Sequence, residues 1–262
     1  MNNDPHRHPL RYQDDTDEDY GHYRSRSPWF KWVAVLVVLA FLALALPNLV
    51  HLLNAGQGLQ QDPTLNSDPL AQAAKPGIVL VQARTENGLA LQGKRGTGFN
   101  IRDDGAIVTN EHVVSDALSV SVLFLDGRIY YTNRWQKVGD ADLVVLDIRA
   151  EGLPVLPLKD YMPQIGQTVT VIGNPLDMER LVQKGTISTV APSSGKEHCG
   201  CFEILITAAP GLSGSPVIDD TGAVIGVVYA ARQAIDSQSS TALAIPLSTV
   251  RTDLQSALKR LK

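Results

Sequence analysis

From Gly77 onward, the chain alternates short apolar runs, rich in β-branched residues, with turn signals, a pattern typical of β-structure. The segments expected as strands are IVLVQA, TGFNI, AIVT, LSVSVLF, RIYYT, DLVVLDI, TVTVIG, TISTV, EILIT, SPVID and AVIGVVYA. Breaks such as Asp-Asp-Gly at 103–105 and Gly-Asn-Pro at 173–175 favour turns. Helical periodicity is nearly absent here, so the pattern predicts two antiparallel β-barrels or a sandwich, and not alternating strands and helices.

Only the last segment of the chain shows helical spacing. Over residues 248–262 the apolar side chains recur on one stripe, and Ser248 is placed to cap the first turn. The stripe consists of Val250, Leu254, Leu258 and Leu261. The spacing predicts an amphipathic helix that packs on the β-structure, and we expect no further domain after it.

A long apolar stretch near the N-terminus predicts a membrane anchor. Residues 32–53 carry no formal charge and, as a helix, would span roughly 30 Å of hydrocarbon. Positive charges at Arg24, Arg26 and Lys31 precede the stretch, and the next one lies at Lys75. Because cytoplasmic flanks carry the excess of Lys and Arg, this asymmetry predicts a cytoplasmic N-terminus. A cleaved signal peptide and a buried core helix are the alternatives.

Composition divides the chain into four expected parts. Residues 1–28 are polar and charged and are expected to form a disordered cytoplasmic tail. The anchor helix is expected over 29–53, and residues 54–72, rich in Gly, Gln, Asp and Pro, suit a flexible linker. Residues 73–262 then form the globular domain, outside the cytoplasm.

Charge and cysteine content limit the classes of function. The net charge is −4 and no block of Lys and Arg appears, so nucleic acid is not an expected partner. Cys199 and Cys201 are the only cysteines, so packing must stabilise the fold. Beside His198 they could form a metal cluster, a disulfide or two free thiols. Because closed zinc sites use four protein ligands, we predict no metal.

Two segments offer a base and an acid. In TNEHVV, 109–114, His112 follows the expected strand AIVT, where an ordered backbone can aim an imidazole. In GDADLVVLDI, 139–148, Asp142 abuts the apolar run, whereas Asp140 lies one step out in the turn. A buried carboxylate at Asp142 could accept the Nδ1–H of an imidazole and fix its tautomer.

A third segment, PGLSGSPV at 210–217, places Ser213 between glycines. A serine nucleophile needs a sharp turn that exposes its hydroxyl, and glycine permits the unusual φ values of such a turn. The amides of Gly211 and Ser213 would then form an oxyanion hole. Each segment alone also fits a half-buried histidine, a turn aspartate or a hairpin, so the combination carries the prediction.

The sequence resembles the chymotrypsin-like (trypsin-like) serine proteases over about residues 75–255, and among them the HtrA/Deg branch. GTGFNIRDDGAIVTNEHVV resembles the segment that leads to the catalytic histidine, DGRIYYTNRWQKVGDADLVVLDI the stretch that ends at the catalytic aspartate, and GLSGSPVID the nucleophile motif. TGAVIGVVYA with ALAIPLSTV resembles the closing strands and helix. The resemblance implies a triad of His112, Asp142 and Ser213 on two six-stranded antiparallel β-barrels with a C-terminal helix. The apolar stretch described above adds one transmembrane helix before them.

Three features depart from the family pattern. Leu212 stands where Asn or Asp is usual, and Ser215 stands where a second glycine is common. The segment 207–210 is shorter than in the HtrA branch. No PDZ domain is expected after the helix, so peptide-activated assembly of the HtrA kind is not expected either.

The resemblance implies a serine endopeptidase that acts on proteins or peptides without a cofactor. Together with the apolar stretch and its flanking charges, this predicts an enzyme anchored in a bacterial-type inner membrane with a periplasmic protease domain. The walls of the primary specificity pocket are expected to be Thr207, Ala208, Val228, Tyr229 and Ala230. This mainly small and apolar set suggests cleavage after small or medium aliphatic residues. The alternative is a catalytically inactive protease fold that serves as an extracytoplasmic binding or sensing module, and Leu212 is the feature that favours it.

Overall fold

The protein, seen in a computed structural model, divides into two compact units, Met1–Leu53 and Asn54–Lys262. The structure describes residues 32, 33, 36, 62–87, 90–175, 179–191, 200–233 and 240–261. Among these residues, no helix is both long and apolar enough to cross a bilayer. The expected tail, nearly all of the expected anchor and the first part of the expected linker lie outside them.

Two short helices precede the first strand. α2 (Pro63–Asn66) and α3 (Pro69–Ala74) each follow an aspartate, and the carboxylates of Asp62 and Asp68 accept a backbone N–H of the first turn at 2.8 and 2.9 Å. Proline suits this position because the N–H that it lacks would have no helical partner. Ala71 is fully buried, so the second half of the expected flexible linker is helical and packs on the domain.

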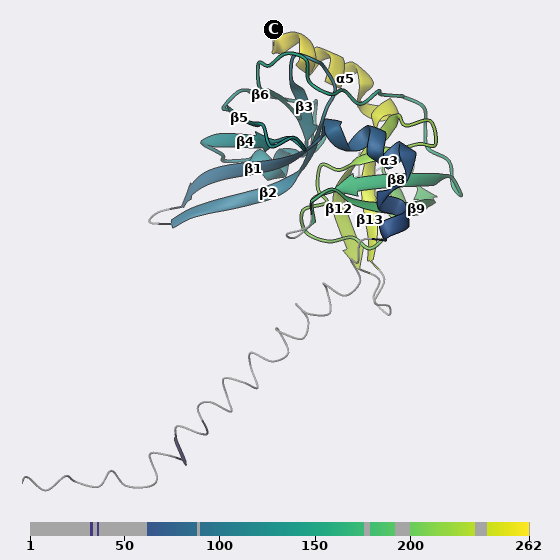
Figure 1. Cartoon of the computed structure of the whole chain (residues 1–262), viewed down its shortest axis with the longest axis horizontal. Helices are drawn as coiled ribbons and strands as arrows, with labels where there is room; N and C mark the ends of the chain where they lie inside the picture. Colours follow the sequence, from purple (N-terminus) through teal and green to yellow (C-terminus); the bar gives the residue numbers. More distant parts are fainter. Residues whose placement is uncertain are drawn as a thin grey trace, which may run out of the picture. The chain divides into compact units, whose positions relative to one another are not determined.

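The first sheet contains seven antiparallel strands in the order β5-β4-β1-β2-β3-β7-β6 (Figure 1). Its strands are β1 (Ile78–Asn87), β2 (Ala90–Asn100), β3 (Ala106–Thr109), β4 (Ser119–Leu123), β5 (Ile129–Thr132), β6 (Trp135–Lys137) and β7 (Val144–Asp147). The short helix η1 (Lys75–Gly77) precedes β1, and α4 (Glu111–Val114) lies between β3 and β4. Alternate residues Val79, Val81 and Ala83 of β1 are buried in one core cluster. Ile78 and Leu80 are buried as well, so the apolar run that predicted this strand is buried as a whole.

The first sheet is not the closed six-stranded barrel that was expected. It has seven strands, and β5 and β6 end its ladder without pairing to each other in the described part of the chain. At this gap the Thr132 hydroxyl donates to Asp147 O at 2.7 Å and accepts the Arg134 N–H at 3.0 Å. The Thr132 hydroxyl thus links β5 to β7 and to the loop before β6, while β5, with four residues, and β6, with three, form no ladder with each other in the described residues.

The second sheet is a closed barrel, as expected, with six strands in the order β10-β13-β12-β11-β8-β9. Its strands are β8 (Thr168–Gly173), β9 (Leu181–Val190), β10 (Phe202–Leu205), β11 (Pro216–Ile218), β12 (Val224–Gln233) and β13 (Ser240–Pro246). The segment that connects the two sheets is tied to this barrel, because Lys159 Nζ and the Tyr161 hydroxyl both donate to the buried Asp219 carboxylate. Burial raises the pKa of Asp219, but hydrogen bonds from Thr221 and Ala223 outweigh it and hold the pKa below its usual value.

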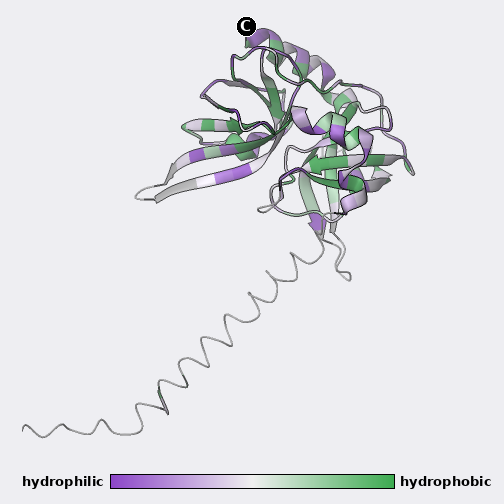
Figure 2. Cartoon of the chain, viewed as in Figure 1, coloured by the Kyte–Doolittle hydropathy of each residue, from purple (hydrophilic) through white to green (hydrophobic). Residues whose placement is uncertain are grey.

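The C-terminal helix α5 (Leu247–Arg260) contacts β6 and β7 of the first sheet and β12 and β13 of the second. Its expected apolar stripe is confirmed, because Val250, Leu254 and Leu261 are buried, and Figure 2 shows both hydrophobic and hydrophilic residues along the helix. The predicted cap at Ser248 is wrong, since the helix begins at Leu247 with Pro246 as its N-cap. The result is an all-β two-barrel fold with a C-terminal helix, in which one barrel is closed and the other is open.

Candidate active site

A histidine and an aspartate of the first sheet form a close pair. Asn110 follows β3 and starts the one-turn helix α4, which carries His112. His112 Nδ1 lies 2.6 Å from Asp142 Oδ2, and the His112 backbone N–H donates to Asp142 Oδ1 at 3.0 Å. Both carboxylate oxygens therefore contact the same residue, which fixes the ring relative to the backbone that carries it.

Asp142 lies in the turn before β7 and is less buried than the sequence suggested. Its side chain is 31% exposed, and that of His112 is 49% exposed. The Asn110 side chain donates from Nδ2 to Asp142 O at 2.7 Å, so a fully buried amide holds the aspartate backbone beside β3. Asp140 is exposed in the same turn, as expected. Sequence analysis missed Asn110, although it lies two residues before His112.

Ser213 occupies a sharp turn between two glycines with positive φ, Gly211 at +99° and Gly214 at +84°. A Cβ on Gly214 would lie 1.9 Å from Thr97 O, so only glycine fits this position without moving the backbone. Ser213 itself is half-buried, in contrast to the fully buried Ser215. The turn thus holds a partly accessible serine, and its backbone does not accommodate a side chain at Gly214.

Strand β2 brings the serine turn and the histidine helix together. A Cβ on Gly96 would lie 2.8 Å from Val113 Cγ2 and 3.1 Å from Ser213 O, so both segments pack over the same glycine. The Thr97 N–H also donates to Ser213 O at 2.8 Å. No hydrogen bond joins the Ser213 hydroxyl to the His112 ring in the described chain, and such bonds are often long before substrate binds.

Among the described residues, two backbone N–H groups of the serine turn have no acceptor. The amides of Leu212, Gly214 and Ser215 donate to Ala209 O, Val228 O and Leu212 O. In the described part of the chain, the amides of Gly211 and Ser213 donate to nothing. Free N–H groups on a rigid turn suit an anionic oxygen, which is the role that the sequence suggested for these two residues.

The expected pocket walls lie in the second barrel but do not all face one core. Ala208 and Val228 belong to the same apolar cluster, whereas Tyr229 packs against the cluster that α5 covers, and Thr207 and Ala230 are half-buried. Sequence analysis missed Gln183 of β9, whose amide accepts the Thr207 N–H and donates to Thr207 O, both at 3.1 Å. This pair of bonds fixes the first wall residue.

The two unusual residues of the serine turn have structural explanations. The Leu212 side chain is 2% exposed and packs in the core of the second barrel, so an apolar anchor stands where a polar residue is usual. The Ser215 hydroxyl is buried and has no hydrogen-bond partner among the described residues, and a Cβ on Gly173 would lie 2.1 Å from it. Ser215 is therefore not placed to act as a nucleophile.

We expect Ser215→Ala to retain most activity and to raise the free energy of unfolding by about 1 kcal/mol, because a buried hydroxyl without a partner costs stability. Urea unfolding and peptide hydrolysis of the variant measure the two effects. Ser256→Ala is the control, because it removes an exposed hydroxyl that donates to Thr252 O within its own helix, and it should leave stability almost unchanged. A loss of activity in Ser215→Ala would contradict the placement of this hydroxyl.

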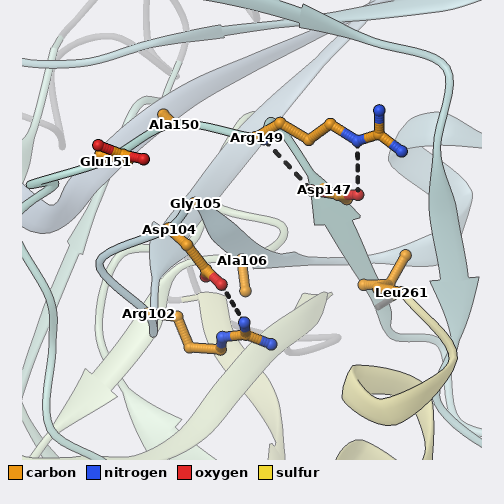
Figure 3. A pocket seen from close by; sticks show the side chains of 9 residues that line it. All are labelled: Arg102, Asp104, Gly105, Ala106, Asp147, Arg149, Ala150, Glu151 and Leu261. Atoms are coloured by element: carbon orange, nitrogen blue, oxygen red, sulfur yellow. Dashed lines mark hydrogen bonds and ion pairs between the residues drawn. The ribbon is translucent and has the colours of Figure 1, made fainter.

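A separate pocket of about 440 Å³ is lined by Arg102, Asp104, Gly105, Ala106, Asp147, Arg149, Ala150, Glu151 and Leu261 (Figure 3). None of the candidate catalytic residues lines it. Arg102 pairs with Asp104, and Arg149 lies 3.6 Å from Asp147, so its arginines already have carboxylate partners. We therefore do not assign the candidate chemistry to this pocket.

The sequence matches a known family over the segment that contains all three candidate residues. Residues 96–227 match the family described as trypsin-like peptidase domain. The chain is 40% identical over 139 residues to a probable periplasmic serine endoprotease DegP-like of Chlamydia trachomatis, an alignment that covers 51% of this chain and 27% of that protein.

Two further proteins extend the similarity. Serine endoprotease DegS of Escherichia coli is 33% identical over 205 residues, which covers 73% of this chain and 57% of DegS. The crystal structure of the active form of Rv3671c protease from M. tuberculosis matches with a TM-score of 0.64 at 26% identity, over 76% of this chain and 88% of that one. The chain spans only part of the length of both curated relatives.

Proposed function

Because the chain belongs to the trypsin-like peptidase family, we propose that it is a serine endopeptidase with Ser213, His112 and Asp142 as its catalytic triad. The observation that carries the proposal is the double contact of the Asp142 carboxylate with the ring and the backbone of His112. This contact orients the ring and leaves Nε2 as the nitrogen that can accept a proton. The substrates are proteins or peptides, and the reaction requires no cofactor.

In the proposed reaction, Ser213 Oγ attacks the scissile carbonyl carbon while His112 Nε2 takes the hydroxyl proton. The N–H groups of Gly211 and Ser213 stabilise the oxyanion of the tetrahedral intermediate. Collapse of this intermediate breaks the C–N bond, and the amine leaves with the proton held by His112. Water then attacks the acyl-enzyme by the same route and restores the Ser213 hydroxyl.

Labelling with a fluorophosphonate tests the nucleophile directly, because an activated serine displaces fluoride and forms a stable phosphonate ester. We expect the native domain to be labelled, peptide mass spectrometry to locate the label on Ser213, and heat denaturation to abolish the reaction. A native protein that neither reacts with the probe nor cleaves casein would favour the alternative, an inactive protease fold that serves as a binding or sensing module.

We also propose a preference at the cleavage site, from the residues expected to line the specificity pocket. Of these, Ala208 and Val228 belong to one apolar cluster, and neither carries a charge that could pair with Arg or Lys. We therefore propose cleavage after small or medium aliphatic residues. A peptide library that is hydrolysed mainly after basic residues would contradict this part of the proposal.

We also propose that residues 29–53 anchor the chain in a bacterial-type inner membrane, between a cytoplasmic tail at 1–28 and a periplasmic domain that follows the linker. The charge asymmetry around the apolar stretch supports this topology. The DegP-like relative is named a probable periplasmic protein, which supports the placement of the protease domain.

The topology predicts that protease added to spheroplasts will digest residues 73–262 and leave an epitope at the N-terminus protected. Detergent should expose that epitope, which serves as the control for an intact membrane. Extraction with alkaline carbonate should leave the protein in the membrane pellet. Digestion of the epitope alone would reverse the orientation, and release of the intact chain by carbonate would exclude an anchor.

A further inference from the structure

The geometry points to Thr97 as a positioning residue for the oxyanion hole, an inference that rests on the proposed function. Thr97 belongs to β2 of the first sheet, whereas the serine turn belongs to the second barrel. It is fully buried and reaches the turn twice. Its N–H donates to Ser213 O and its hydroxyl donates to Gly211 O, both at 2.8 Å. One residue of the opposite sheet thus holds the carbonyls on both sides of Leu212.

The direction of the Thr97 hydroxyl proton is determined by its partners. The Asn174 backbone N–H, 2.8 Å away, can only donate, and the Gly211 carbonyl can only accept, so the hydroxyl proton points to Gly211 O. Asn174 is itself fully buried, donates from Nδ2 to Val79 O at 3.0 Å and accepts the Arg180 N–H at 3.1 Å. The hydroxyl is therefore a fixed link between the sheets.

The peptide group between Gly211 and Leu212 needs such a link. Its N–H donates to Ala209 O at 3.2 Å, and its carbonyl is held by Thr97. Glycine has no Cβ to restrict the rotation of this peptide, so restraint must come from outside the turn. Rotation would change the angle between the free N–H groups of Gly211 and Ser213, which must converge on one oxygen to stabilise it.

Thr97→Val removes the hydroxyl but keeps the branched shape of the side chain. We expect kcat to fall about 10- to 100-fold with little change in KM, which is less than the 10²- to 10³-fold loss typical when an oxyanion donor itself is removed. The affinity for a peptide boronic acid, which places an oxygen in the oxyanion hole, should fall by the same factor as kcat. Affinity for the amine-side product, which has no carboxylate at the cleaved bond to enter the oxyanion hole, should not change.

Thr132→Val is a matched control, because Thr132 is also a buried threonine of the first sheet whose hydroxyl donates to a carbonyl and accepts a backbone N–H. It should lose stability like Thr97→Val while it keeps the parent kcat. Thr97→Ser restores the hydroxyl and should recover most of the lost kcat. Thr97→Ala and Thr97→Ser differ only in the oxygen atom, so this pair tests the bond even where the valine variant does not fold.

The outcomes separate this inference from the proposed function. A parent protein that lacks hydrolysis and fluorophosphonate labelling would reject the function. If the parent is active, equal kcat values for Thr97→Ala and Thr97→Ser would reject the positioning role. A fall in kcat of Thr132→Val equal to that of Thr97→Val would also reject it, because lost stability alone would then explain both.

Discussion

Replacement of Ser213 by alanine is expected to lower kcat by about 10⁶-fold, the size of loss seen when the nucleophile of a serine protease is removed. Alanine removes only the hydroxyl oxygen and keeps the amide of residue 213 and the glycines on both sides. The Thr97 N–H still has its carbonyl partner, Ser213 O being a backbone atom. Stability should therefore change little, and a small residual rate should remain from the oxyanion hole and substrate binding.

The double variant of Ser213 and His112 provides a sharper test than either single change. We expect His112→Ala to cost about as much as Ser213→Ala, and the combination to cost little more than one of them. Residues that act in the same step lose their contribution together, whereas independent residues show losses that add in free energy. Additive losses in kcat, measured on one peptide substrate, would contradict a shared role.

The control for the nucleophile is Ser215→Ala, which should react with fluorophosphonate like the parent protein. Ser213→Ala should not react at all. The opposite pattern, with labelling retained in Ser213→Ala and lost in Ser215→Ala, would move the nucleophile two residues along the turn. The burial of the Ser215 hydroxyl argues against that outcome.

The sequence was sufficient where the relevant contacts are local or repeat along a strand. Short apolar runs rich in β-branched residues, separated by turn signals, identified most strands, and the closed second barrel is built from such strands. The segment that begins at Asp62 was misjudged, because Asp and Pro mark a turn or linker as readily as they mark the start of a helix. The open first sheet could not be foreseen either, since whether its edge strands β5 and β6 pair depends on how segments distant along the chain meet.

The supporting residues of the candidate site could not be found in the sequence, because their contacts join distant parts of the chain. Thr97 bonds to Gly211 across 114 positions, and Gln183 bonds to Thr207 across 24. Neither residue type predicts a partner by itself. His112 and Asp142 could be paired only because the combination of three segments resembled a known family, and the geometry of their contact, with both carboxylate oxygens engaged, came from the fold.

Asp142→Asn is expected to lower kcat by about 10⁴-fold while the fold stays intact, by comparison with the same change in other triads. The asparagine oxygen can still accept the His112 backbone N–H, which Asp142 Oδ1 accepts now. Its amide nitrogen would then face His112 Nδ1 in place of Oδ2 and would donate to it. The ring proton would move to Nε2, so that nitrogen could no longer accept the proton of the Ser213 hydroxyl.

Asp140→Asn is the matched control for this prediction, because it makes the same chemical change two residues earlier in the same turn, on an exposed side chain. It should keep the parent kcat, and both variants should keep the parent melting temperature to within a few degrees, the shift expected for about 1 kcal/mol. A large loss of kcat in Asp140→Asn, together with near-parent activity of Asp142→Asn, would assign the orienting carboxylate to Asp140. Near-parent activity of both would mean that His112 needs no carboxylate to select its tautomer, and the double contact with Asp142 would then be structural.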